Sequence, residues 1–211
     1  MVLALFVTSS IFLVSYLFVS LYLYKKDNAV PFNMRNHFPF EIYSPKHRVN
    51  GIVNIVLFLA FAMFFTNFIS LLFYDLSLTN VLMVVLAFLI SACSIILFYL
   101  PVAREKVHFT VSLLLAISSV MINALFIFIE LRMVRLYEEK LFIIPIVISG
   151  LLILTYLFFI VHPRLFNLEM KRDENGNQIR PKYFIMSLFE WVLIISIFIS
   201  QISLLFIDIL G

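Results

Sequence analysis

The feature that most constrains this chain is a series of six long apolar runs separated by short polar segments. An α-helix needs roughly 20 apolar residues to cross a bilayer core of about 30 Å. Only 13% of the 211 residues are charged, about half the share found in soluble domains. We therefore predict an all-α integral membrane bundle, one domain over residues 1–211. Its six transmembrane helices are expected near 1–24, 51–74, 80–100, 109–130, 141–162 and 183–208.

The first run differs from a secretory signal peptide at both of its ends. No basic residue precedes it, and no small-residue cleavage pattern follows it. It ends in aromatic and basic residues typical of a membrane interface, including Tyr24 and Lys25. We expect it to be retained as the first helix. Cys93, the only cysteine, excludes a disulfide within the chain.

The distribution of Lys and Arg between alternate loops predicts the orientation. Twelve lie in loops on one side (25–48, 101–108 and 164–182), and three lie on the other, all in 131–140. Short loops rich in Lys and Arg face the cytoplasm. We therefore predict that loops 25–50 and 164–182 are cytoplasmic and that both termini are on the non-cytoplasmic side. The composition, rich in Phe, Ile and Leu, favours a bacterial plasma membrane, with the mitochondrial inner membrane as the alternative.

Loop 25–50 contains three prolines, which exclude a continuous helix, and aromatic residues too apolar for a free linker. One interpretation is a segment in the headgroup layer that caps the bundle. The other is a binding surface for anionic head groups or a partner, through Arg35, Lys46 and Arg48. His37 and Glu41 are four residues apart, but the prolines break the helix that would align them, so we predict no metal there.

Loop 164–182 contains Asn175-Gly176 between residues able to form strands, a pattern typical of a two-residue hairpin turn. We predict a small β-hairpin on the cytoplasmic side. Pro181 is expected to begin the last helix, since proline suits the first helical turn. The hairpin is either a surface feature or a docking site for a soluble partner.

Four of the predicted helices carry a stripe of small or polar residues at near-heptad spacing. In lipid, such stripes let helix backbones approach and hydrogen-bond to each other. We expect them to mark packing faces, with a polar pocket near Asn54, Asn67 and Asn123 as the alternative. The stripes are Ala4, Thr8, Ser15 and Tyr22; Ala60, Met63, Asn67, Ser70 and Tyr74; Asn80, Ala87, Ser91 and Ser94; and Ser112, Ala116, Ser119, Asn123 and Glu130.

The last helix contains Glu190, a carboxyl group well inside an apolar run. An ionised carboxylate there must be paired, hydrated or protonated. Glu190 and Gln201 share one face of the helix and Ser196, Ser200 and Ser203 the opposite one, so this helix should pack between neighbours. Asn54 is a candidate partner for Glu190. The side chain either fixes packing or forms a proton- or cation-linked site.

No catalytic, cofactor, metal or nucleic-acid signature occurs in the chain. We therefore expect no cofactor, no metal and no nucleic-acid partner, and we lean against an enzyme. The leading hypothesis is a non-catalytic accessory or scaffold subunit of a larger membrane complex, in contact with other membrane subunits or with copies of itself. The alternatives are a small transport component (a channel or substrate-binding subunit) or, less favoured, a lipid-modifying enzyme.

Overall fold

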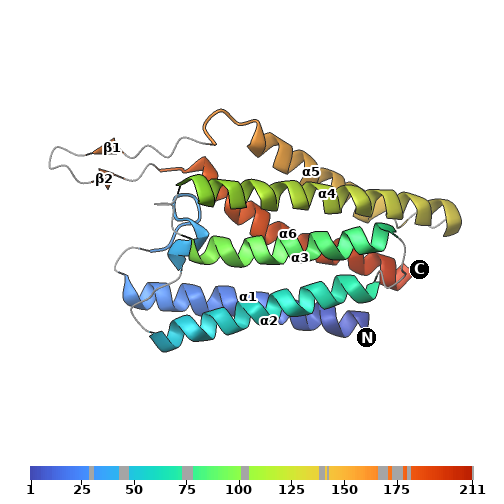
Figure 1. Cartoon of the computed structure of the whole chain (residues 1–211), viewed down its shortest axis with the longest axis horizontal. Coiled ribbons are helices and arrows are strands. Elements are labelled where there is room, and N and C mark those ends of the chain that lie inside the picture. Colours follow the sequence, from blue (N-terminus) through green and yellow to red (C-terminus); the bar gives the residue numbers. More distant parts are fainter. Residues whose placement is uncertain are drawn as a thin grey trace.

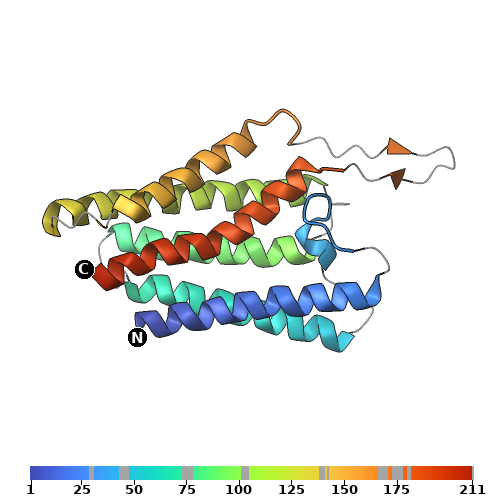
Figure 2. The same cartoon turned by 180° about the vertical axis from the view of Figure 1, so that it is seen from behind.

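The computed structural model describes residues 1–28, 31–42, 48–72, 78–100, 105–137, 141, 143–165, 171–172, 178–179 and 182–210. Within them the fold is a bundle of six long helices (Figures 1 and 2), as predicted. The elements are α1 (Val2–Asp27), the short 3₁₀ helix η1 (Pro39–Ile42), α2 (Arg48–Leu72), α3 (Leu78–Tyr99), α4 (Glu105–Tyr137), α5 (Ile143–Ile160), β1 (Lys171–Arg172), β2 (Gln178–Ile179) and α6 (Ile185–Leu210).

Five of these helices are long and apolar enough to span a membrane within the described residues. They are α1, α3, α4, α5 and α6, and α2 contributes a shorter apolar stretch, Ile55–Leu71. Both termini lie at one end of the bundle, while η1 and the β1–β2 pair lie at the other (Figure 1). An even number of passes would place the termini in this way.

Consecutive helices pack against each other in order, and α6 also contacts α1, α4 and η1. The last helix therefore closes the bundle onto the first. Of its apolar span 61% is buried, against 17% for α1. This central position confirms the expectation that α6 packs between neighbours, because a helix that is polar on two faces would be unstable at the lipid boundary.

The helix boundaries differ from the predicted ones for local reasons. α4 continues to Tyr137, about two turns further than expected, because 131–137 contains no glycine or proline to end it. α5 ends at Ile160, before His162 and Pro163, since the residue preceding a proline is disfavoured in a helix. α6 begins at Ile185 rather than at Pro181, which lies outside the described residues.

The predicted hairpin in loop 164–182 is present as two paired residues on each side. Lys171 pairs with Ile179 and Arg172 with Gln178, antiparallel. The predicted hairpin is therefore confirmed at these four residues, and its turn, residues 173–177, lies outside the described part of the chain.

The packing faces of α3 and α4 follow the predicted stripes. In α4 all five stripe residues are buried, and in α3 Ala87, Ser91 and Ser94 are. The α1 and α2 predictions are wrong. On α1 the buried polar residues are Ser9 and Ser20, while Ala4 and Tyr22 are exposed.

On α2 the inward face is formed by phenylalanines and the predicted stripe faces outward. Phe58, Phe61, Phe65 and Phe68 are buried, whereas Met63 and Asn67 are exposed. Aromatic pairs explain this preference, since Phe58 packs 4.8 Å from Phe98 and 5.0 Å from Tyr16 between ring centroids. The side chain of the final stripe residue, Tyr74, lies outside the described residues.

Residues 31–42 of loop 25–50 insert against α6 at the end of the bundle that carries the β1–β2 pair. The His37 carbonyl accepts hydrogen bonds from Ser187 Oγ (2.7 Å) and Trp191 Nε1 (2.8 Å). The Arg35 carbonyl accepts one from the Phe184 backbone N–H (2.8 Å). Phe38 and Ile42 are buried. This segment, called the plug below, is consistent with the capping interpretation of the loop.

Replacing Ser119 by Leu is expected to lower the free energy of unfolding by about 1–3 kcal/mol. The larger side chain does not fit the buried packing face of α4 without displacing its neighbours. Ser119 is 3% exposed, and its carbonyl accepts a hydrogen bond from Asn123 Nδ2 at 2.8 Å. The thermal midpoint in detergent, followed by circular dichroism, measures the change. Thr110→Leu, at an exposed position of α4, is the control and should leave the midpoint unaltered. Equal midpoints for both variants would contradict a tight seam.

Candidate functional site

Polar side chains form a column between α4, α5 and α6, at three levels along the bundle. The first level joins Glu190 of α6 to α4. Ser112 Oγ donates to Glu190 Oε1 at 2.7 Å, and His108 Nε2 lies 2.7 Å from the same oxygen. This second contact is close but is not aligned as a hydrogen bond. Glu190 and His108 are 0% and 2% exposed.

The contacts of His108 show that this pair holds a proton. Its Nδ1 lies 2.9 Å from the Leu100 carbonyl, which can only accept, so Nδ1 carries a hydrogen. With Nε2 unprotonated and Glu190 ionised, two electron-rich atoms would lie only 2.7 Å apart with no hydrogen between them. One of the two groups must therefore be protonated, and the pair is neutral overall either as an ion pair or as acid and imidazole.

The plug covers this level from the end of the bundle. The ring centroids of Phe38 and Phe40 lie 5.8 and 5.9 Å from that of His108, both edge-on. Since these rings cover the pair, its polar contacts are those with Ser112, with the Leu100 carbonyl and between its two members. The second oxygen of Glu190, Oε2, has no hydrogen-bond partner among the described residues.

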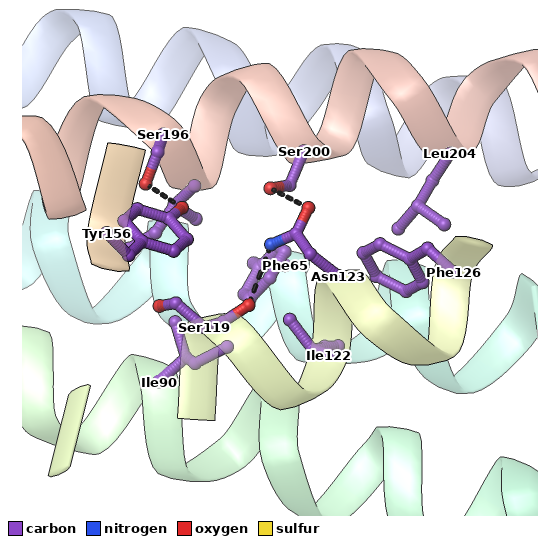
Figure 3. A pocket seen from close by; sticks show the side chains of 11 residues that line it. Phe65, Ile90, Ser119, Ile122, Asn123, Phe126, Tyr156, Ser196, Ser200 and Leu204 are labelled. Atoms are coloured by element: carbon purple, nitrogen blue, oxygen red, sulfur yellow. Dashed lines mark hydrogen bonds between the residues drawn. The ribbon is translucent and has the colours of Figure 1, made fainter. Parts of the chain in front are cut away.

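The second level surrounds a small cavity (Figure 3). Ser200 Oγ donates to Asn123 Oδ1 at 3.3 Å. On the α5 side the Tyr156 hydroxyl donates to Ser196 Oγ, which donates to the Leu193 carbonyl at 2.6 Å. The space open to the centre of a water molecule is about 10 Å³, which is room for about one water.

The third level lies towards the end of the bundle that carries the termini. Ser203 Oγ lies 3.3 Å from Glu130 Oε1 and 3.3 Å from the Pro145 carbonyl. Glu130 and Ser203 are both 0% exposed. Each level therefore ties α6 to α4, and the second and third levels also include α5.

Three of the predicted polar candidates lie inside the bundle. Glu190 and Asn123 belong to the column, while Gln201 lies between α6 and α1, where its Oε1 accepts a hydrogen bond from Ser9 at 3.1 Å. Asn67 is exposed and does not reach the cavity. The side chain of Asn54 lies outside the described residues, so its predicted pairing with Glu190 is not tested.

Of the three basic side chains predicted to contact head groups or a partner, the structure describes one. Arg35 is exposed and its guanidinium lies over the Tyr183 ring, 5.6 Å from the centroid. Lys46 and the side chain of Arg48 lie outside the described residues. Glu41, which was considered with His37 as a possible metal ligand, accepts a hydrogen bond from the Phe38 backbone N–H at 2.7 Å.

Two residues of the column were missed as site residues. The position of His108 at the end of a predicted helix favours an interfacial side chain, and this prediction is wrong because His108 is buried against Glu190. His108 precedes Ser112 by four residues, so extending the α4 stripe back one turn includes it. Glu130 is predicted only as a member of that stripe.

The first level does not have the geometry of a nucleophilic triad. In such triads the histidine lies between the hydroxyl and the acid. Here Ser112 and His108 both contact one oxygen of Glu190. No group of three or more His, Cys, Asp or Glu side chains able to hold a metal occurs in the described part of the chain.

No family model, no curated protein and no solved structure matches this chain.

Proposed function

We propose that this chain is a non-catalytic accessory or scaffold subunit of a larger membrane complex. The observation that carries the proposal is Asn67, an exposed amide within the apolar stretch Ile55–Leu71 of α2. Its Nδ2 donates to the Met63 carbonyl of the same helix at 2.8 Å. Its Oδ1 accepts no hydrogen bond from the described chain. A polar group facing hydrocarbon is unfavourable, and a donor on a partner transmembrane helix would satisfy it.

The interior supports the same proposal. The buried hydroxyl and carboxyl groups of the column pair across helices, and the cavity between them holds about one water. A ligand site for a small molecule usually measures hundreds of cubic ångströms. The part of the bundle that the structure describes is thus better suited to rigid packing than to enclosing a substrate.

A partner at Asn67 can be detected by cross-linking in native membranes. In a Cys93→Ala background, Asn67→Cys is expected to give a disulfide-linked or bismaleimide-linked product larger than the chain. Thr155→Cys is the matched control, because Thr155 is a half-buried polar residue of α5 whose hydroxyl also bonds to its own helix, at the Leu151 carbonyl (2.8 Å). A product of twice the chain mass would identify a second copy, and a different mass another subunit.

The affinity of the interface gives a second measurement. Asn67→Leu should weaken the assembly about threefold to twentyfold, the range of one hydrogen bond between membrane helices. Thr155→Leu should leave it unchanged. If Asn67→Cys forms no product and Asn67→Leu assembles normally, Asn67 faces lipid and the proposal fails.

A transport component remains the second candidate, favoured by two buried carboxyl groups. Glu190 and Glu130 are both 0% exposed, and each has an oxygen without a hydrogen-bond partner. Intramembrane carboxyl groups often mark proton or ion pathways. The intervening length of α4, from Ser112 to Ser119, contributes the apolar residues Leu115 and Ala116 to the core, which favours separate sites over a continuous path.

We place the chain in the bacterial plasma membrane, with the mitochondrial inner membrane as the alternative, and with both termini outside. The supporting observation is that Lys25, Lys26, Arg35 and Lys182 are exposed at the end of the bundle opposite the termini. Cytoplasmic loops carry an excess of such residues, which also attract anionic head groups.

A further inference from the structure

The third level of the column contains a carboxyl group that no basic side chain of the described residues contacts. Glu130 is 0% exposed, and its only hydrogen bond within the described chain comes from Ser203 at 3.3 Å. Its Oε2 has no hydrogen-bond partner in that part of the chain. Arg132 and Arg135 of α4 are exposed. The described helices packed against this site, α5 and α6, contain no Lys, Arg or His.

The neighbouring groups present oxygen atoms to this site. Ser203 Oγ lies 3.3 Å from both Glu130 Oε1 and the Pro145 carbonyl. A hydroxyl has one hydrogen and can donate to only one of them at a time. When Glu130 is ionised, the remaining contact therefore brings two oxygen lone pairs together without a hydrogen between them.

Ser149 lies one helical turn after Pro145, on the same face of α5. It is 0% exposed, and its Oγ has no hydrogen-bond partner among the described residues. Serines in membrane helices commonly donate to the carbonyl four residues earlier, as Ser91 and Ser94 do here at 2.9 and 2.7 Å. For Ser149 that carbonyl belongs to Pro145, which is contacted by Ser203 instead.

We propose that Glu130, Ser149, Ser203 and the Pro145 carbonyl form a binding site for a small monovalent cation, Na⁺. Hard cations bind through carboxylate, carbonyl and hydroxyl oxygens. One carboxylate and uncharged oxygens balance a single positive charge, whereas a divalent ion would leave an unpaired charge buried. The cation satisfies the two unpartnered oxygens, Oε2 of Glu130 and Oγ of Ser149.

The site lies nearer to one end of the bundle. Glu130 is seven residues from the end of α4, Pro145 is in the first turn of α5, and Ser203 is seven residues from the end of α6. At 1.5 Å per residue the site lies about 10 Å from the end of the bundle that carries the termini. The shorter route for a cation is therefore from that end. The site is independent of the proposed partner at Asn67, which lies on the outer face of α2.

The experiment compares thermal midpoints of the full-length protein in detergent, by circular dichroism, in NaCl, KCl or choline chloride at equal ionic strength and pH. A ligand that binds only the folded state raises the midpoint as its concentration increases. We expect NaCl to raise the midpoint of the unsubstituted chain in a saturable manner above KCl and choline chloride. Glu130→Gln should abolish this difference.

Ser149→Ala provides a second variant that is expected to fold, since it removes only an unpartnered hydroxyl. In this variant the Na⁺ concentration that gives half of the maximal rise in thermal midpoint should be about tenfold higher. Ser94→Ala, which removes a buried but back-bonded hydroxyl, and Glu190→Gln should retain the response of the unsubstituted chain.

Three results would overturn the proposal. One is a midpoint that is equal in NaCl, KCl and choline chloride, as for a protonated Glu130 without a cation. Another is a Na⁺ response that persists in Glu130→Gln. The third is a half-effect concentration that is the same for Ser149→Ala and Ser94→Ala.

Discussion

Glu190→Leu should destabilise the bundle by about 3 kcal/mol, the lower end of the range for breaking a buried ion pair. The lower end applies because the unfolded chain in a membrane also finds polar partners. The substitution leaves His108 and Ser112 buried without the carboxylate that both contact. Unfolding in mixed detergent micelles, followed by circular dichroism, measures the free energy.

Two further variants test the cause of this loss. Glu190→Gln keeps one polar amide atom at the position that both Ser112 and His108 contact, so it should cost about 1 kcal/mol. Combining Glu190→Leu with His108→Leu removes both buried polar groups, and it should recover part of the stability that Glu190→Leu loses. If the double variant is no more stable than the sum of the single variants predicts, the two residues do not act as a pair.

Trp191→Ala is expected to cost about 3–5 kcal/mol, as for other large-to-small substitutions of buried aromatic residues. Trp191 is 1% exposed, and its ring packs against Phe32 of the plug at 5.6 Å and Phe98 of α3 at 6.2 Å between centroids. Because Trp191 is the only tryptophan, circular dichroism must replace intrinsic fluorescence as the measurement.

Trp191→Phe separates packing from hydrogen bonding. It keeps most of the ring and loses the bond from Nε1 to the His37 carbonyl, which Ser187 continues to contact at 2.7 Å. A loss of about 1 kcal/mol is expected. The plug should become sensitive to protease in Trp191→Ala and remain protected in Trp191→Phe. Equal losses in the two variants would show that the ring contributes little.

Helix number and the α4 packing face could be predicted from the sequence because they follow from strong physical requirements. In a chain of this composition, a run of about twenty apolar residues is typical of a transmembrane helix. On α4, Ser112, Ser119, Asn123 and Glu130 recur on one face, and an amide or carboxyl group at such depth must face protein or water. Deep amide and carboxyl groups therefore indicate which face of a helix contacts protein or water.

The inward faces of α1 and α2 could not be predicted in the same way. Phenylalanine, alanine and threonine tolerate both lipid and protein neighbours, so their spacing does not distinguish the two sides. Thr8 satisfies its hydroxyl through the Ala4 carbonyl at 2.7 Å, which removes the cost of facing outward. The α2 face is decided by the fit of Phe58 to Tyr16 and Phe98, which requires knowledge of the neighbouring helices.

The candidate site depends on contacts between distant parts of the sequence. Glu190 could be identified from its depth in an apolar run, but its partner His108 is 82 residues earlier and on a helix whose register was unknown. The oxygen cluster at Glu130 requires α5 and α6 to be in place, since Pro145 and Ser203 are separated by 58 residues. No pattern within a single helix predicts it.

The attachment of the plug to α6 has a consequence for biogenesis. The carbonyls of Met34 and His37 are bound by Ser187 and Trp191, about 150 residues later in the chain. During translation the first five helices are therefore made before the plug can complete its hydrogen bonds, and the contacts of His108, Asn123 and Glu130 with α6 also form only then. Nascent chains that end before Ile185 should accordingly be substrates for membrane proteases or insertion chaperones. Insertion of α6 should end their susceptibility.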